Sequence, residues 1–142
     1  MKILILAIGR LKEAYWAAAE AEYQKRLRRY APVDLREVKD DAALLAAVPA
    51  RAKLIILDER GEQLSSAEWA EKLIAREQQH GGGATLVFGI GGAEGFGAQV
   101  RSRAARVLGF GRITLPHRLA RIILLEQIYR AFTIVRGEPY HK

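Results

Sequence analysis

The chain has 142 residues, half of them hydrophobic, and contains no cysteine. A chain of this size forms one ordinary domain that buries roughly 70% of its unfolded surface, so we expect a single domain over residues 1–142. The missing cysteines exclude a disulfide framework and a thiolate metal site, and the histidines lack close ligand spacing, so we expect no metal. The apolar runs are too short to cross a bilayer and no signal segment is evident, which predicts a cytoplasmic protein without a membrane partner.

The net charge of +7 lies entirely in the last third of the chain. Residues 1–94 hold equal numbers of acidic and basic residues, whereas residues 95–142 hold nine Lys and Arg against two Glu. Eight of these nine are arginines, whose planar guanidinium suits phosphate groups and base edges. We therefore favour a nucleic-acid partner, the alternative being a solvated basic face.

Strand-like and helix-like runs alternate along the chain. Runs rich in Val, Ile and Leu predict five strands, at Lys2–Ile8, Val33–Val38, Lys53–Leu57, Ala84–Phe88 and Arg112–Leu115. Helical spacing predicts helices over Leu11–Arg29, Asp40–Ala47, Ala67–Gln79, Gly97–Val107 and Leu119–Val135. Ser65 and Glu68 predict a capping box at the start of the third helix. Strands bounded by helices indicate an α/β fold with a mainly parallel sheet and helices on both faces.

Ligands of such sheets bind at the carboxyl ends of the strands, where three segments stand out. Asp58 follows the third strand and is either a general base or ribose ligand, or part of a plain polar turn. The glycine-rich segment Gly89–Gly97 lacks the spacing of a dinucleotide fingerprint, so it is either a bare backbone surface for a flat ring or a tight turn. Glu94 within it is favoured as a helix-start charge. His117 and Arg118 open the last helix and could act on an anion or stay structural.

The chain ends in Gly137-Glu-Pro-Tyr-His-Lys, directly after an apolar helical run. Termini usually fray and carry no function. A phenol and an imidazole at Tyr140 and His141, stiffened by Pro139, indicate instead a tail that reaches a site.

Taken together, these segments resemble a known family over the whole chain. The stretches that match are Leu57–Ser66, Ile90–Gly95, Leu115–His117 with Arg121, Glu126–Ala131 and Pro139–Lys142. They are similar to the bacterial large-subunit ribosomal RNA methyltransferase H family, which are pseudouridine N3-methyltransferases of the SPOUT superfamily.

The resemblance implies a C-terminal trefoil knot from about Ala84 onward, a homodimer packed through the last helix, and S-adenosylmethionine as cofactor. The cofactor contacts that it implies are Leu57, Gly91, Gly92, Gly111, Arg112, Ile113, Thr114, Leu115 and Pro116. The substrate it implies is 23S ribosomal RNA within the assembled ribosome.

The resemblance also suggests roles for the candidate catalytic residues. His141 would manage the proton of the reacting base and Tyr140 would stack on or hydrogen-bond to that base. His117 and Arg118 would position the base or its phosphate. The alternatives are another SPOUT RNA methyltransferase, acting on transfer RNA or a ribose hydroxyl, and a non-catalytic RNA-binding or ribosome-associated module.

Overall fold

The structure is a computed structural model that describes residues 1–141, with His141 described by its backbone alone. Its sheet has five strands in the order β2-β1-β4-β3-β5, and each neighbouring pair is parallel. The strands are β1 (Lys2–Ile8), β2 (Val33–Val38), β3 (Lys53–Gln63), β4 (Thr85–Ile90) and β5 (Arg106–Gly109). The α/β class and the parallel sheet predicted from the sequence are confirmed.

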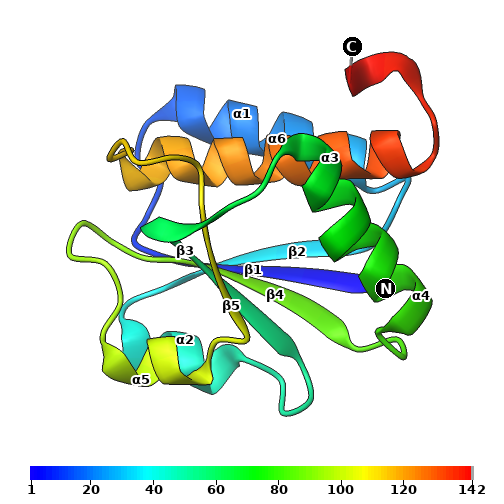
Figure 1. Cartoon of the computed structure of the whole chain (residues 1–142). Coiled ribbons are helices and arrows are strands. Elements are labelled where there is room, and N and C mark those ends of the chain that lie inside the picture. The colour runs from blue at the N-terminus through cyan, green and yellow to red at the C-terminus, as the bar shows by residue number, and fades with distance from the viewer. Residues whose placement is uncertain (142) are drawn as a thin grey trace.

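Helices cover both faces of this sheet (Figure 1). One face carries α1 (Ala14–Leu27), α6 (His117–Val135) and a continuous helix made of α3 (Ser66–Glu68), η1 (Trp69–Ala75) and α4 (Arg76–His80); the other carries α2 (Asp41–Ala47) and α5 (Ala98–Arg103). The segment η1 is π-helical, and a short 3-10 turn, η2 (Pro139–His141), follows α6. The predicted capping box of Ser65 and Glu68 is present. Among residues 1–141, no helix has the length and hydropathy needed to cross a membrane.

Strand β1, which has a neighbour on either side, shows why the molecule has two cores. Side chains alternate along a strand, so Ile3 and Ile5 face one side of the sheet while Leu4 and Leu6 face the other. The first pair packs in the larger core under α1, α6 and η1, and the second pair packs in the smaller core with Leu44 of α2. A strand that is apolar at every position is therefore a strand buried on both faces.

The prediction for the fifth strand was wrong. Residues 112–115 form a loop, and β5 is instead Arg106–Gly109. The helix predicted to extend to Val107 ends at Arg103, which leaves these residues free to form the strand. Only Val107 and Leu108 are apolar aliphatic residues in β5, too few to show a strand by pattern. Pairing with β3 makes this segment a strand, which is a case of tertiary contacts overriding local preference.

The third strand also continues past its predicted end, and it meets β5 at very close range. The pairing between them shifts register between Leu57 and Glu62. A Cβ atom on Gly61 would lie 2.6 Å from the carbonyl carbon of Leu108, and one on Gly109 would lie 2.6 Å from the carbonyl oxygen of Asp58. No larger residue fits there, so two glycines permit the two backbones to touch.

Arg121 of α6 forms the main buried ionic contact of the described chain. Its side chain is 2% exposed, and its guanidinium lies 2.8 Å from Glu20 of α1 and 2.9 Å from Glu37 of β2. Glu37 also accepts a 2.8 Å hydrogen bond from the backbone N–H of Leu11, in the loop between β1 and α1. One guanidinium thus joins α6 to the neighbouring helix, to the edge strand and, through Glu37, to a loop.

We predict that Arg121→Met lowers the free energy of unfolding by about 3–5 kcal/mol, because the two carboxylates are left without their buried partner. The matched control is Lys72→Met, which breaks an exposed ion pair with Glu68 and should cost far less, because solvent screens exposed pairs. Urea unfolding of both variants measures the difference. Equal losses in the two variants would contradict the prediction.

We predict that Gly109→Ala costs about 1–3 kcal/mol, because the added methyl group forces β3 and β5 apart. Gly92→Ala serves as the control, since its Cβ would stand 3.5 Å from Ile8, an ordinary contact. The same denaturant series reports both values, and an unchanged midpoint for Gly109→Ala would rule out the close approach.

Candidate active site

A cavity of about 740 Å³ opens at the carboxyl ends of β4 and β5, beside the irregular middle of β3 where its register shifts. Its wall consists of Leu57–Arg60, Ile90–Phe96, Gly109–Gly111 and Ile113–His117, together with Arg101 and Ala120. Pockets for small ligands measure roughly 300–1,000 Å³ and favour the carboxyl ends of strands in α/β sheets. The cavity therefore has both the size and the place of a ligand site.

Bare backbone forms part of this wall. Gly111 has a φ of +122°, a conformation that favours glycine, and a Cβ atom there would meet nothing within 4 Å. Leu57, Ile90 and Leu115 add apolar side chains around the same space. A flat ring can lie against a surface of this kind, with main-chain groups available to hydrogen-bond to its edge.

Asp58 and Arg101 form an ion pair in the wall. Burial alone would raise the pKa of Asp58, but hydrogen bonds from the Arg101 guanidinium and from the backbone N–H of Arg60 lower it to about 2. Arg101 also donates to the backbone oxygen of Phe96 at 3.1 Å. Asp58 is thus a fixed carboxylate at neutral pH, which disfavours the general-base alternative for this residue.

A second link joins the two sides of the cavity mouth. The hydroxyl of Thr114 donates a 2.5 Å hydrogen bond to Glu59. Glu59 belongs to the irregular middle of β3 and Thr114 to the loop before α6, and both residues line the cavity. This contact holds the loop against β3.

His117 lies at the first position of α6, where the helix meets the cavity. Burial lowers the pKa of His117, and the positive charges of Arg118 and Arg121 lower it further against the opposing effect of Glu13. Arg118 itself is 3.4 Å from Glu13, and its Nε is buried without a hydrogen-bond partner among the described residues. A neutral imidazole at pH 7 can accept a proton or a hydrogen bond.

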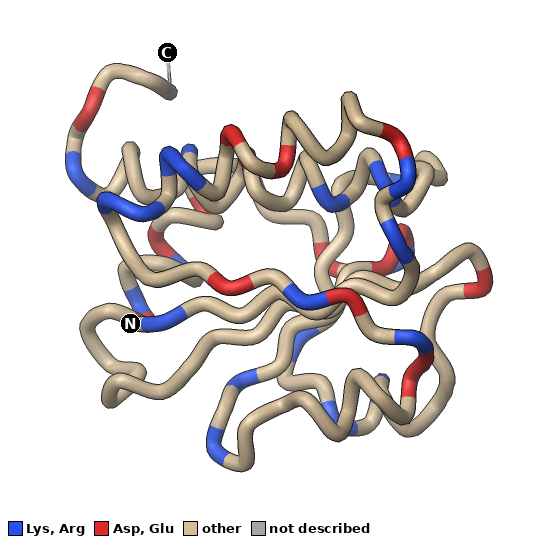
Figure 2. Tube along the Cα trace, turned by 180° about the vertical axis from the view of Figure 1, so that it is seen from behind, with Lys and Arg blue, Asp and Glu red and all other residues tan. Residues whose placement is uncertain are grey.

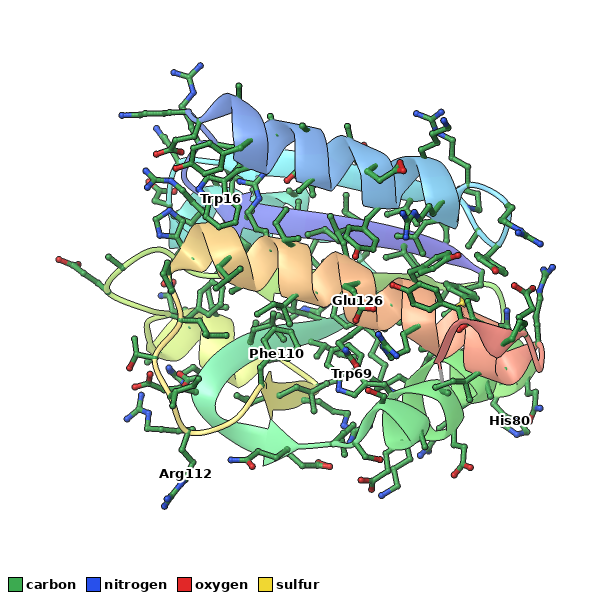
Figure 3. All side chains as sticks on the ribbon, turned by 90° about the horizontal axis from the view of Figure 1, so that it is seen from above. Trp16, Trp69, His80, Phe110, Arg112 and Glu126 are labelled. Atoms are coloured by element: carbon green, nitrogen blue, oxygen red, sulfur yellow. The ribbon has the colours of Figure 1, made fainter. Side chains whose placement is uncertain are left out.

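Most of the expected cofactor residues share this cavity. Those that line it are Leu57, Gly91, Gly92, Gly111, Ile113, Thr114, Leu115 and Pro116. Arg112 is exposed and points away from the body of the molecule (Figure 3). Of the expected catalytic residues, His117 lines the cavity and Arg118 follows it on α6.

Tyr140 lies elsewhere in the same chain. Its hydroxyl donates a 3.0 Å hydrogen bond to Glu126, and its ring packs edge-on against Tyr129 at 4.7 Å. Burial and the bond to Glu126 raise the pKa of Tyr140, so the phenol stays protonated. Glu126 is nine residues beyond His117, or about 13 Å along the helix at 1.5 Å per residue. The side chain of His141 lies outside the described residues.

Four residues of the cavity wall were not singled out from the sequence, namely Arg101, Gly109, Phe110 and Ala120. Phe110 stacks on Trp69 of η1 at 5.8 Å, and both rings lie under α6 in Figure 3. The step from β5 to the loop could not be placed while the fifth strand was expected elsewhere. Arg101 sits on a short helix, and only its pairing with Asp58 distinguishes it from other surface arginines.

Comparisons with known proteins identify the family of the chain. A family model described as "Predicted SPOUT methyltransferase" matches residues 1–141. The chain belongs to the SPOUT methyltransferase family. A relative named "Ribosomal RNA large subunit methyltransferase H", from Anaeromyxobacter dehalogenans (strain 2CP-C), is 43% identical over 156 aligned positions that cover 100% of both chains. The family resemblance seen in the sequence is thereby confirmed.

Solved structures share the fold of this SPOUT methyltransferase. A probable methylase family protein from Haemophilus influenzae Rd KW20 has a TM-score of 0.62 at 14% identity, covering 99% of this chain and 70% of that one. A structure described as "Structural insights into the 2-OH methylation of C/U34 on tRNA" has a TM-score of 0.55 at 21% identity, covering 97% and 98%. At these identities the likeness concerns the fold alone.

We predict that the pKa of His117 lies below its ordinary value of 6.5, as an NMR titration of the imidazole would measure. Because the unfolded chain then binds the proton more readily, the free energy of unfolding should fall as the pH drops below about 6.5. Arg118→Gln should raise this pKa, since it removes a nearby positive charge. Arg112→Gln removes an arginine that points outward and should leave the pKa in place. A wild-type value at or above 6.5 would contradict the prediction.

Proposed function

We propose that this SPOUT methyltransferase transfers a methyl group from S-adenosylmethionine to N3 of a pseudouridine in 23S ribosomal RNA. The observation that carries this function is the cavity at the carboxyl ends of β4 and β5 and beside the middle of β3, because eight of the nine expected cofactor residues line it. The 43% identical relative, named for the large ribosomal subunit, supports the choice of substrate.

The described residues fit the cofactor. Its adenine can lie between Leu57 and Leu115 against the bare main chain at Gly111, where a side chain would fill open space. Its positive ammonium and sulfonium groups suit a wall that contains the carboxylates of Asp58, Glu59 and Glu94. Arg60 and Arg101 line the same cavity and suit its carboxylate. When bound, the cofactor supplies an electrophilic methyl group on a cationic sulfur.

The protein must manage the proton that N3 of the substrate base loses. We assign this task to His141. His117, a neutral imidazole in the cavity wall, would help to position the base or its phosphate. Arg118, beside it at the start of α6, would hold the base or its phosphate, and Tyr140 would contact the base through its ring or hydroxyl. A water-poor site favours the reaction, because opposite charges are lost as the methyl group moves.

We further propose a homodimer packed through α6, in which the tail of one subunit serves the cavity of the other. Tyr140 bonds to Glu126, which is about 13 Å along α6 from His117, so a tail that acts on the substrate from this position would serve the cavity of a second copy. We also infer that the crossing of β3 and β5, with the loop that leads to α6, is part of the trefoil knot expected for this family. The contact at Gly61 and Gly109 supports that inference.

The decisive experiment supplies labelled S-adenosylmethionine with free 23S RNA, large subunits and whole ribosomes, followed by digestion and identification of the methylated nucleoside. We expect label on N3 of a pseudouridine and greatest incorporation with ribosomes. Label on a ribose or in transfer RNA would indicate another SPOUT activity. Calorimetry without cofactor binding would instead favour a non-catalytic RNA-binding module.

We predict that His141→Ala lowers turnover in this assay by about 10²- to 10⁴-fold if the imidazole accepts the proton, while cofactor binding is kept. His80→Ala is the matched control, because this histidine is exposed on α4 and lies outside the cavity wall. Full activity of His141→Ala would remove the residue from this role.

A further inference from the structure

A second group of charged and aromatic side chains lies where α1 and α6 end. We call it the Arg–Tyr patch, and it consists of Tyr23, Arg26, Arg29, Tyr30, Tyr129 and Arg136. In Figure 2 several Lys and Arg positions lie at this end of the molecule, beside the C-terminus. Arg136 follows His117 by 19 residues, which places Arg136 about 28 Å along α6 from the histidine in the cavity wall of the same subunit.

Each arginine of the patch has its guanidinium over an aromatic ring. The guanidinium of Arg26 lies 5.2 Å from the ring centre of Tyr23 and 5.7 Å from that of Tyr129. Arg29 and Arg136 lie 5.2 Å and 4.9 Å from the ring centre of Tyr30. Because these planar groups are already oriented, a ligand that stacks on them costs less side-chain entropy.

The core fixes the rings beneath. Tyr30 stacks on buried Phe132 with centroids 5.2 Å apart and planes 9° apart, and its hydroxyl donates a 2.6 Å hydrogen bond to Glu138. Burial and this bond raise the pKa of Tyr30 to about 12, so the ring stays neutral. A platform of this kind does not rearrange with pH in the physiological range.

The charge around the patch is not balanced within the protein. Arg26 pairs with Glu22 at 3.6 Å and Arg29 with Glu138 at 3.7 Å, both at half-exposed or exposed positions where ion pairs are weak. Among residues 1–140, Arg136 and the adjacent Lys25 and Arg28 have no carboxylate within ion-pair distance. Five cations therefore face two carboxylates on one exposed end, an arrangement that attracts a polyanion.

Building on the proposed function, we propose that the Arg–Tyr patch binds a single-stranded segment of the RNA substrate outside the catalytic cavity. Phosphates would bind the guanidinium edges, and unpaired bases would stack on the guanidinium or tyrosine planes. A duplex offers phosphates but no free base faces, so the patch should prefer single strands. The proposed dimer packs through α6, so the patch must stay clear of that interface, and repulsion between its cations and those of a second copy favours this.

The test compares three double variants of the full chain by fluorescence anisotropy. The probe is a short, unstructured, fluorescein-labelled RNA, used single-stranded and as a duplex over a range of salt. Arg29→Gln/Arg136→Gln removes two charges, and Arg29→Lys/Arg136→Lys keeps the charges but removes the planar groups. Lys39→Gln/Arg51→Gln is the charge-matched control, from exposed positions beside α2 on the opposite face. Thermal unfolding and solution mass are recorded for each.

The glutamine pair should weaken single-strand binding about tenfold and reduce the slope of log K against log salt by about 0.7 for each phosphate that the protein no longer neutralises. The Arg29→Lys/Arg136→Lys variant should keep most of the slope of log K against log salt, but it should no longer prefer single-stranded RNA over duplex RNA. The control pair should change the affinity by less than the glutamine pair does.

Three results would overturn the inference: a glutamine pair that binds like wild type or like the control, a duplex bound as tightly as the single strand, or a glutamine pair whose main defect is loss of dimer mass. Cofactor binding and methyl transfer are measured on the same proteins. A wild-type protein that binds RNA through the patch but methylates none would leave the patch intact and refute the proposed function.

Discussion

The buried guanidinium of Arg121 is the contact on which the arrangement of the site depends. It lies one helical turn after His117, so the two carboxylates that hold it also fix the start of α6 against the sheet. Its charge contributes to lowering the pKa of that histidine. Nothing in the sequence distinguishes Arg121 from the other arginines, yet its ion pairs hold three elements together. It is paired with carboxylates because an unpaired buried charge strongly destabilises the fold.

The cavity depends on a second constraint, which is steric. Gly61 and Gly109 let β3 and β5 approach until their backbones touch, and the loop that leaves β5 then runs along the end of β3. The hydrogen bond between Thr114 and Glu59 keeps that loop in place. Chain segments that are far apart in sequence thus form one wall of the cavity. Among the described residues, no group of His, Asp and Glu side chains is arranged to bind a metal ion.

The sequence predicted the sheet, its helices and most of the cavity residues for different reasons. Strands β1 and β4 can be recognised from the sequence, because burial on both faces leaves no polar residue after the first position of either strand. β5 could not be found this way, since its identity comes from pairing with β3 rather than from its own residues. The cofactor segment 111–116 was assigned by family resemblance while its local structure was predicted incorrectly. The ion pair between Asp58 and Arg101 and those of Arg121 could not be predicted, because the partners lie more than 40 positions apart in the chain.

The parallel course of α1 and α6 has an electrostatic consequence. Glu13 meets Arg118 at one end and Tyr23 meets Tyr129 farther along, so both helices begin beside the cavity and both end at the opposite pole. Their aligned peptide dipoles place partial positive charge at the cavity and partial negative charge at the far pole. The basic side chains at that pole, Lys25, Arg26 and Arg136 among them, reverse the sign of the field there. A polyanion therefore encounters attraction along the whole length of this helical layer, rather than at the cavity alone.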